Sequence, residues 1–455
     1  MQRAFQVTLL IASSTAISSC VPAREAPLEP VKIGVLSSTS GALGSFGSSL
    51  QKAVFLAQEQ VNAAGGVFDA RPLELVVRDT TSDPATAASL AAELLDEGVA
   101  AIVGPETSGQ SGAVLEVATA AKIPMVSCCA TSTELSGQAS AGSGFFFRTA
   151  PSDLLQGKAL AFVAKNGVDD VASGVSFPSC NQVAFFTRPD SYGTGFQAVF
   201  EDNYTGAGAI VARGAFATDD PNAEDIDTSS ATFIDAIKAN ASADDELCIV
   251  FITFGSEGAR LVGNVERALV TATTTAADPL FNMGYHYLTG DGAQEAAFLQ
   301  DLQQQPSSLR AKLLGTVPFH ATSPAFDQFS TAFSARFGEL PSAYCAQAFD
   351  AMFVTALAAT RARSTDGEDV RNALFAVSGR DGGVKFEDGN FFGEIAARVL
   401  DGDDVDYVGP SGDLTFDGSG DVQGDYVLWQ VGDAGDTLTF EDKVALPVSQ
   451  FDPLR

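Results

Sequence analysis

Two polar loops in the first third of the chain follow apolar runs and precede helical patterns. Residues 104–111 (GPETSGQS) follow the run that ends at Val103, and residues 127–134 (SCCATSTE) follow the run that ends at Val126. Backbone amides at a helix N-terminus, with Ser and Thr hydroxyls beside them, favour an anion. Each loop alone is typical of helix capping. If the two loops follow neighbouring strands of one sheet, they together predict a binding site for a carboxylate.

The elements that would position these loops alternate between strands and helices. The spacing of Leu50, Ala53, Val54, Ala57 and Val61 is that of a buried helix face. Strands are predicted at 31–36, 73–77, 99–103, 123–126, 182–187, 210–216, 247–254 and 285–288, with helices between them. This alternation predicts an α/β protein with parallel sheets covered by helices on both faces, in two units of domain size.

Other parts of the chain do not follow this alternation of strands and helices. The acidic stretch 219–229 is expected to be a solvated loop before a helix at 231–239. Two consecutive helices are predicted at 326–337 and 343–363. Residues 414–421 (LTFDGSGD) lack the ligand order of a calcium loop and favour a β-hairpin turn, so we expect no metal there.

Composition excludes several classes of function. The chain has 455 residues, with 26 Lys and Arg against 57 Asp and Glu, a formal charge of −31. Nucleic acids and anionic lipid surfaces are bound by clustered basic residues, so neither is an expected partner. The chain has two histidines, His286 and His320, which leaves little room for a histidine metal site or a catalytic triad.

A third loop, residues 37–47, resembles a dinucleotide fingerprint only superficially. Its glycines at 41, 44 and 47 do not have the G-x-G-x-x-G spacing. We expect no cofactor and no enzymatic activity.

The N-terminus predicts export. The apolar and small residues 4–17 are too few to span a bilayer but suit a signal peptide. The sequence Ile17-Ser18-Ser19-Cys20 is similar to a bacterial lipobox, which favours lipidation of Cys20 over an ordinary signal peptide. We expect a signal peptide at 1–19 and a lipidated tether at 20–30, anchoring the protein to a bacterial membrane at the periplasm or cell surface.

Five cysteines remain in the exported chain: Cys128, Cys129, Cys180, Cys248 and Cys345. Cys180 and Cys248 each lie at the start of a predicted strand. They form a disulfide if those strands are neighbours, and are two buried free thiols otherwise.

Eight short motifs occur in an order that resembles the type I periplasmic solute-binding proteins of ABC importers, in the leucine/isoleucine/valine-binding group. The motifs are KIGV at 32–35, NAAGG at 62–66, RD at 78–79 with DP at 83–84, VGP at 103–105, ATS at 130–132, FRTAPSD at 147–153, SYGTG at 191–195 and PSAYCAQAFDA at 341–351. Each motif alone is weak evidence for the resemblance, but the eight motifs occur in order, and the resemblance covers residues 31 to about 430.

The resemblance implies two Rossmann-like lobes joined by a three-crossover hinge that closes on the ligand. We expect lobe 1 at 31–150 and 318–405, and lobe 2 at 151–317 and 406–445. A monomer is expected.

The resemblance also implies ligand-binding residues. The ligand α-carboxylate is expected at the Ser108 hydroxyl, the backbone of Cys129 and Ala130, and the Thr131 hydroxyl. Tyr192 is expected over the ligand, Asp291 at the α-ammonium, and Phe46 against an apolar side chain. These groups complement a zwitterion: hydroxyls and amides for its negative end, one carboxylate for its positive end.

Four positions depart from the family pattern. Phe254 falls where a second tyrosine is common, so its hydrogen bond is missing or moved. Cys128 and Cys129 are expected to be small buried thiols, although a reactive vicinal pair is an alternative. Glu106 lies beside the predicted carboxylate-binding site, and its side chain is expected to point away from that site.

The predicted function is therefore delivery of an amino acid, branched-chain or otherwise apolar, to the permease subunits of an ABC importer. The alternative is a sensor or receptor domain for amides or aromatic acids, without transport. An exported enzyme is disfavoured because the sequence offers no nucleophile–base pair.

Overall fold

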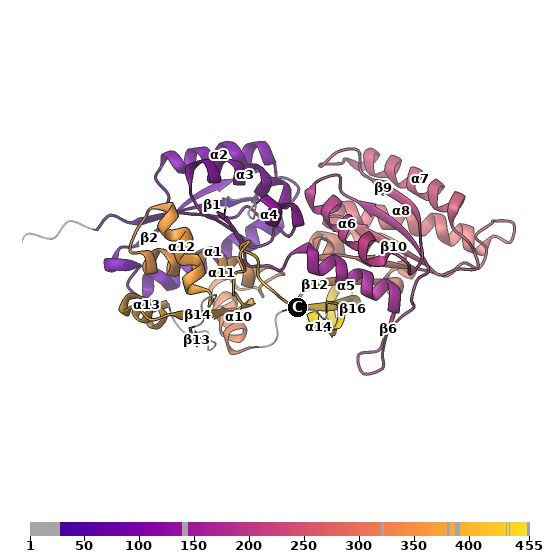
Figure 1. The fold of residues 1–455 in the computed structure, drawn as a ribbon. Helices are drawn as coiled ribbons and strands as arrows, with labels where there is room; N and C mark the ends of the chain where they lie inside the picture. Colours follow the sequence, from indigo (N-terminus) through magenta and orange to yellow (C-terminus); the bar gives the residue numbers. More distant parts are fainter. Residues whose placement is uncertain are drawn as a thin grey trace, which may run out of the picture.

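The computed structural model describes residues 28–138, 144–319, 323–379, 383–386, 392–433, 435 and 437–452. Cys20, the expected signal peptide at 1–19 and His320 lie outside the described residues. The chain forms two lobes side by side (Figure 1), each built on one sheet. Within the described part of the chain, no helix has the length and apolar character needed to cross a membrane.

Lobe 1 contains a five-stranded parallel sheet of order β2-β1-β3-β4-β5. Its strands are β1 (Val31–Ser37), β2 (Leu73–Asp79), β3 (Ile102–Val103), β4 (Met125–Ser127) and β5 (Phe146–Arg148). The helices are α1 (Gly44–Ala63), α2 (Pro84–Asp96), α3 (Ser108–Ala121), α4 (Thr133–Gln138), α10 (Pro324–Phe337), α11 (Cys345–Ala362), α12 (Gly367–Val377) and α13 (Phe392–Asp401). One apolar core lies against α1 and α11, and another against α2 and α3.

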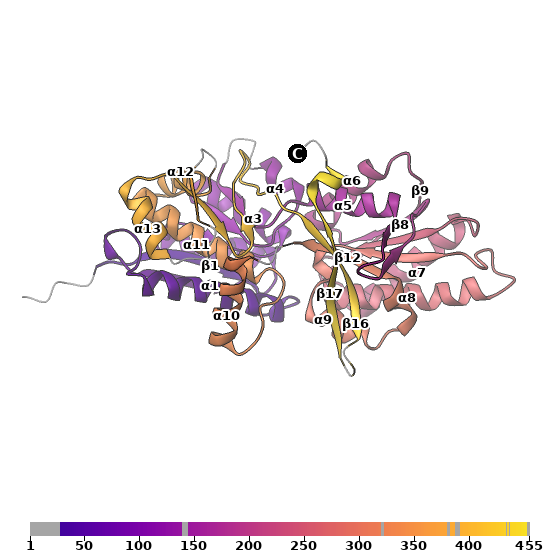
Figure 2. The same cartoon turned by 90° about the horizontal axis from the view of Figure 1, so that it is seen from below.

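Lobe 2 contains a seven-stranded sheet of order β17-β16-β12-β11-β10-β8-β9. Its strands are β8 (Gln182–Thr187), β9 (Ala209–Ala215), β10 (Leu247–Ile252), β11 (Tyr285–Thr289), β12 (Leu313–Pro318), β16 (Tyr426–Asp433) and β17 (Leu438–Leu446). The helices are α5 (Asp153–Asn166), α6 (Ser191–Tyr204), α7 (Ala223–Asn240), α8 (Gly255–Thr274), α9 (Ala296–Leu302) and α14 (Val448–Phe451). The last two strands run antiparallel and close one edge (Figure 2).

Short elements complete the two lobes. They are η1 (Phe68–Ala70), β6 (Val168–Asp170), β7 (Val175–Phe177), η3 (Asp291–Ala293), η4 (Ser307–Lys312), β13 (Val384–Phe386), β14 (Val405–Gly409) and β15 (Gly412–Asp413). Each main sheet has apolar clusters on both faces, so the predicted α/β class with helices covering two parallel sheets is confirmed.

Three chain segments connect the lobes and lie together. The first follows β5 and the second follows β12. The third carries Val422, which pairs with Pro151 of the first, and Asp425, whose carbonyl accepts from the Phe319 amide of the second at 2.9 Å. This is the expected three-crossover hinge.

The last crossing lies later in the chain than the sequence analysis placed it. Tyr407, Leu414, Phe416 and Val422 belong to the lobe 1 core, so residues 406–422 pack with lobe 1, not lobe 2. The reason is that β14 and β15 pair in a small separate sheet with β13, away from the lobe 2 sheet.

Residues 414–421 also differ from the predicted hairpin. The Asp417 carboxylate accepts from the amides of Ser419 and Asp421, which makes a tight turn that follows β15. Among the described residues, no group of three or more His, Cys, Asp and Glu side chains is arranged to hold a metal ion.

Candidate functional site

The predicted ligand-binding residues meet between the lobes. Ser108, Cys129, Thr131, Tyr192, Asp291 and Phe46 all line one inner cavity. Ala130 does not: its side chain is fully buried behind the loop. The cavity volume is about 30 Å³, far below the roughly 300–1,000 Å³ of pockets that enclose a small ligand. An amino acid therefore enters only if the lobes move apart.

Two loops of lobe 1 form one wall. Ser108 begins α3, and its hydroxyl accepts from the Ser132 amide at 3.1 Å, which joins the loop before α3 to the loop after β4. The amide of Ala130 donates to the Ser127 hydroxyl at 3.1 Å, and that of Cys129 lies 3.4 Å from the same oxygen. Both amides expected at the ligand carboxylate therefore have a partner within their own loop.

Arg148 on β5 positions this wall. Its guanidinium is fully buried and donates to the carbonyls of Ala130 and Ser132, at 3.0 and 2.9 Å. It also pairs with the Asp421 carboxylate at 2.7 Å. Because the carbonyls are held on the Arg148 side, the Thr131 side chain between them is turned toward the cavity.

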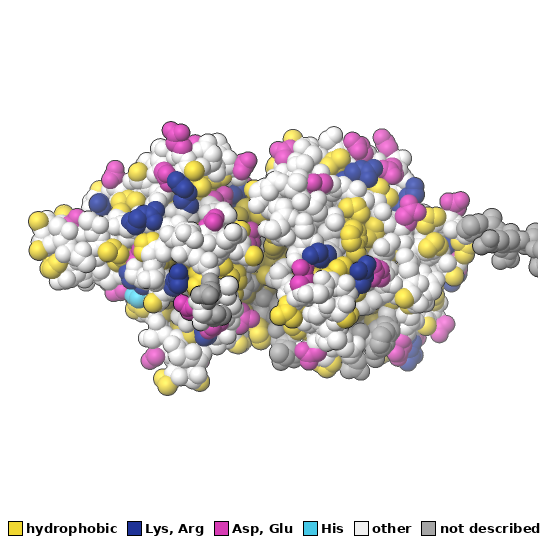
Figure 3. Space-filling view, turned by 180° about the vertical axis from the view of Figure 1, so that it is seen from behind, with side chains coloured by type: hydrophobic (Ala, Val, Ile, Leu, Met, Phe, Trp, Pro, Cys, Tyr) yellow, Lys and Arg dark blue, Asp and Glu magenta, His cyan; other side chains and the backbone are white. Residues whose placement is uncertain are grey.

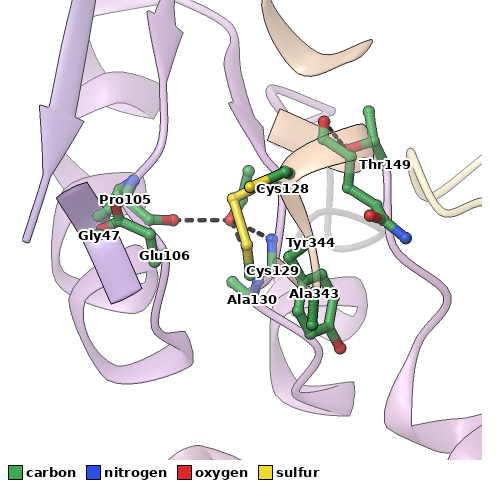
Figure 4. The surroundings of a disulfide bond; sticks show 12 residues. Gly47, Pro105, Glu106, Cys128, Cys129, Ala130, Thr149, Ala343 and Tyr344 are labelled. Carbon is green, nitrogen blue, oxygen red and sulfur yellow. Dashed lines mark hydrogen bonds between the residues drawn. A yellow bond between two sulfur atoms is a disulfide. The ribbon is translucent and has the colours of Figure 1, made fainter. Parts of the chain in front are cut away.

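The vicinal cysteines differ from the expected free thiols. The Sγ atoms of Cys128 and Cys129 are joined, between Glu106 on one side and Tyr344 on the other (Figure 4). Cys128 is buried in the lobe 1 core, whereas Cys129 reaches the cavity. In lobe 2, Cys180 and Cys248 form a second disulfide. Cys345, at the start of α11 in lobe 1, is a buried free thiol.

Glu106 lines the cavity, but its carboxylate is bound within lobe 1. It accepts from the Ser37 hydroxyl at 2.8 Å and from the Ser38 amide at 3.1 Å. Burial raises the pKa of Glu106, while these hydrogen bonds act in the opposite direction.

The lobe 2 wall is centred on Asp291, which is 7% exposed and begins η3 directly after β11. The Tyr192 hydroxyl donates to its Oδ1 at 2.9 Å, and the Tyr344 hydroxyl donates to its Oδ2. Burial raises the pKa of Asp291, and the two tyrosine hydrogen bonds oppose that shift. A carboxylate has acceptor sites beyond these two, so it can still take an ammonium.

Tyr344 is a site residue that sequence reasoning left unassigned, although it lies within the motif at 341–351. It precedes α11 with φ of 66°, a strained conformation for a residue with a side chain. Its bond to Asp291 crosses from lobe 1 to lobe 2. The Ser132 hydroxyl makes a second inter-lobe bond, to the Ser191 carbonyl at 2.9 Å.

Phe254 occupies the place of the missing tyrosine. Its ring stacks on Tyr192, with centroids 5.5 Å apart and planes 3° from parallel. Phe254 has no hydroxyl, and Tyr344 of lobe 1 donates a hydrogen bond to Asp291 beside it. This side of the cavity is therefore aromatic, with hydroxyls directed at Asp291.

Asp153 is a second buried acid beside the hinge. It is fully buried at the start of α5, and neither carboxylate oxygen has a hydrogen-bond partner among the described residues. Burial, and then the charge of Asp291, raise the pKa of Asp153 well above its ordinary value. The two acids oppose each other's ionisation, which leaves a ligand cation more favourable at Asp291.

A cleft of about 750 Å³ lies outside the inner cavity. Leu43, Thr107, Phe254 and Glu295 line both spaces. On the face seen in Figure 3, charged side chains are scattered over both lobes, with the junction between them in the middle.

Comparisons with known proteins agree with this architecture. A sequence profile of the periplasmic binding protein family matches residues 30–402. A Leu/Ile/Val-binding protein homologue from Brucella melitensis is 24% identical over 305 residues, covering 66% of this chain and 76% of its own. The chemotactic signal transduction substrate-binding protein BasB from Halobacterium salinarum is 27% identical over 421 residues, covering 90% and 88%.

Among solved structures, LivJ from Streptococcus pneumoniae in complex with isoleucine has a TM-score of 0.66 at 23% identity, covering 91% of this chain and all of that one. A solute-binding protein from R. palustris in complex with benzoate has the same TM-score at 16% identity, covering 92% and 97%. Because the profile spans most of the chain and the fold agrees, the chain belongs to the periplasmic binding protein family, with the type I fold of its Leu/Ile/Val-binding group.

Proposed function

We propose that this protein captures an amino acid outside the cytoplasm and delivers it to an ABC importer. The observation that carries the proposal is the arrangement of Asp291 on one lobe opposite Ser108 and Thr131 on the other. A free amino acid has one cation and one anion on the same carbon, and these two walls complement that pair.

Closure supplies both affinity and the signal to the importer. The lobes contact each other through Tyr344–Asp291 and Ser132–Ser191. A ligand that contacts both walls favours the closed arrangement by its differential affinity for it. The importer then distinguishes loaded from empty protein by the relative position of the lobes.

A thermal-shift screen of the exported chain against amino acids, amides and aromatic carboxylates tests the proposal. A ligand at 100 times its Kd adds about 2.7 kcal/mol to the free energy of unfolding. Stabilisation by amino acids supports amino acid capture. Stabilisation only by amine-free acids would contradict the role of Asp291.

A second function has one specific observation in its favour. The match to BasB extends over 90% of this chain, and that protein acts in chemotactic signal transduction. In that case closure is passed to a receptor, without transport. Adjacency of the gene to permease and ATPase genes favours import, and adjacency to a transducer gene favours sensing.

Membrane attachment through a lipid on Cys20 is part of the proposal. The Cys20→Ala variant is expected in the soluble fraction, whereas the wild-type protein is expected with membranes. Equal release of both proteins would contradict lipidation.

A further inference from the structure

A second carboxylate stands at the entrance to the inner cavity. Glu295 is the residue before α9, four positions after Asp291, and it lines both the cavity and the outer cleft. Its side chain is largely withdrawn from water, because the residue is only 8% exposed. Neither the family motifs nor the predicted ligand-binding residues include it.

Glu295 has no cation of its own. Among the described residues, no ion pair and no side-chain hydrogen bond reaches its carboxylate, and the hydrogen-bonding group beside it is the backbone amide of Gly255. Arg188, the nearby guanidinium, is already bound to Glu257 at 2.6 Å and Asp190 at 2.8 Å. Burial raises the pKa of Glu295 to about 8. A carboxylate buried without a cation is costly unless a ligand supplies one.

The outer cleft is acidic as well. Its walls carry Asp83, Asp190, Asp219, Asp220, Glu257 and Asp301. The two arginines there, Arg188 and Arg260, are both engaged in ion pairs. Acidic side chains outnumber the two arginines in this cleft, and an excess of one sign of charge concentrates ligands of the opposite sign.

The cavity lining includes the apolar side chains of Leu43, Phe46 and Phe254. Leu43 and Phe254, like Glu295, also line the outer cleft. An apolar wall that ends at a carboxylate is complementary to a methylene chain that ends in a cation, which is the form of lysine, ornithine and arginine side chains.

We propose that Glu295 determines specificity by binding the charged end of a cationic amino-acid side chain, while Asp291 holds the α-ammonium. This rests on the proposed function and narrows its ligand class. It departs from the apolar ligand that the family resemblance implies, because a branched-chain side chain leaves Glu295 without a partner.

Lysine and norleucine test the proposal, since they differ in the terminal ammonium. Titration calorimetry of the full exported chain with both ligands is expected to show at least 10-fold tighter binding of lysine. The Glu295→Gln variant is expected to lose most of that preference while its affinity for norleucine changes less than about 3-fold. Retained norleucine binding shows that the variant is folded.

Glu116→Gln, at an exposed site on α3, is the matched control for loss of one negative charge and is expected to keep the wild-type preference. Two results overturn the inference: equal affinity of the wild-type protein for lysine and norleucine, or an unchanged preference in Glu295→Gln. Both leave amino acid capture standing. Failure of every amino acid to bind would overturn the proposed function as well.

Discussion

The two walls of the cavity reach the same point between the lobes by different chemistry. The lobe 1 wall consists mainly of neutral groups: the Ser108 hydroxyl accepts from the Ser132 amide of the other loop, and the Cys129 and Ala130 amides donate to Ser127 within their own loop. The lobe 2 wall is acidic, with Asp291 held by two tyrosines and Glu295 without a cation. Lobe 1 therefore provides a preorganised shape, whereas lobe 2 provides acidic groups that a cationic ligand can pair with.

The two disulfides also differ, in the length of chain that each one closes. Cys180–Cys248 joins residues 68 apart, one just before β8 and the other on the neighbouring strand β10, whereas Cys128–Cys129 joins adjacent residues and closes no loop. In the chain-entropy account, a disulfide stabilises a protein by restricting the unfolded chain, and more so for a longer loop.

The largest expected effect follows from this difference. Replacing Cys180 and Cys248 by serine should lower the free energy of unfolding by about 4 kcal/mol, the loop-entropy value for this separation. Urea unfolding measures the loss. The paired control, serine at Cys128 and Cys129, should cost less than about 1 kcal/mol; equal losses in the two variants would refute the contrast.

Asp291→Asn tests the charge of the lobe 2 wall. Removing one partner of a buried, hydrogen-bonded charge pair costs about 3 kcal/mol, so amino acid binding should weaken about 100-fold. The matched ligand is the same compound without its α-amine, whose affinity should not fall. If the variant binds both compounds like the wild type, the ammonium lies elsewhere. Calorimetry gives both values.

Glu295 should make stability depend on pH. Its pKa of about 8 in the folded protein exceeds the ordinary value of 4.5, so the folded state binds the proton more tightly than the unfolded state. Its contribution to stability is therefore greatest below pH 4.5 and is lost as pH rises toward 8. The free energy of unfolding of Glu295→Gln, relative to that of the wild type, should increase as pH rises across this range, by at most about 1.4 kcal/mol per pH unit.

Urea unfolding between pH 5 and 8.5, without ligand, measures this difference. The free energy of unfolding of Glu116→Gln should depend on pH in the same way as that of the wild type. A constant offset between Glu295→Gln and the wild type over the whole range would show that Glu295 keeps an ordinary pKa.

Ser108→Ala tests the neutral wall and should have the smallest effect. Loss of one hydroxyl contact to the ligand costs about 1 kcal/mol, or roughly 5-fold in Kd. Ser111→Ala is the control, because Ser111 lies one turn later and donates to the Pro105 carbonyl. Equal losses in both variants would indicate a structural role of Ser108 within α3.

Much of the fold could be predicted from local sequence. Asp83-Pro84 gave the start of α2, where the Asp83 carboxylate accepts from the Thr86 amide at 2.7 Å. Helix α7 was predicted too short, because Asn222 and Asp225 form a capping box inside an acidic stretch that reads as a loop. The capping residues that mark the helix start are in the sequence, but the acidic, polar composition around them is typical of a solvated loop.

The sequence by itself determined the alternating strands and helices, the two lobes and the identity of the loops at the strand ends. These follow from periodicity and capping residues, which act over a few positions. The family resemblance indicated Asp291, because it implies an acidic residue shortly after a lobe 2 strand, and the strand predicted at 285–288 precedes Asp291.

Only the tertiary structure decided which groups meet across the cleft. Tyr344 is 53 residues from Asp291, and its hydroxyl reaches that carboxylate because the hinge brings the start of α11 beside β11. The joined sulfurs of Cys128 and Cys129 and the carboxylate of Glu295, which has no cation beside it, likewise depend on burial and on neighbours from distant segments. No local pattern encodes these, because the two lobes are each assembled from separated parts of the chain.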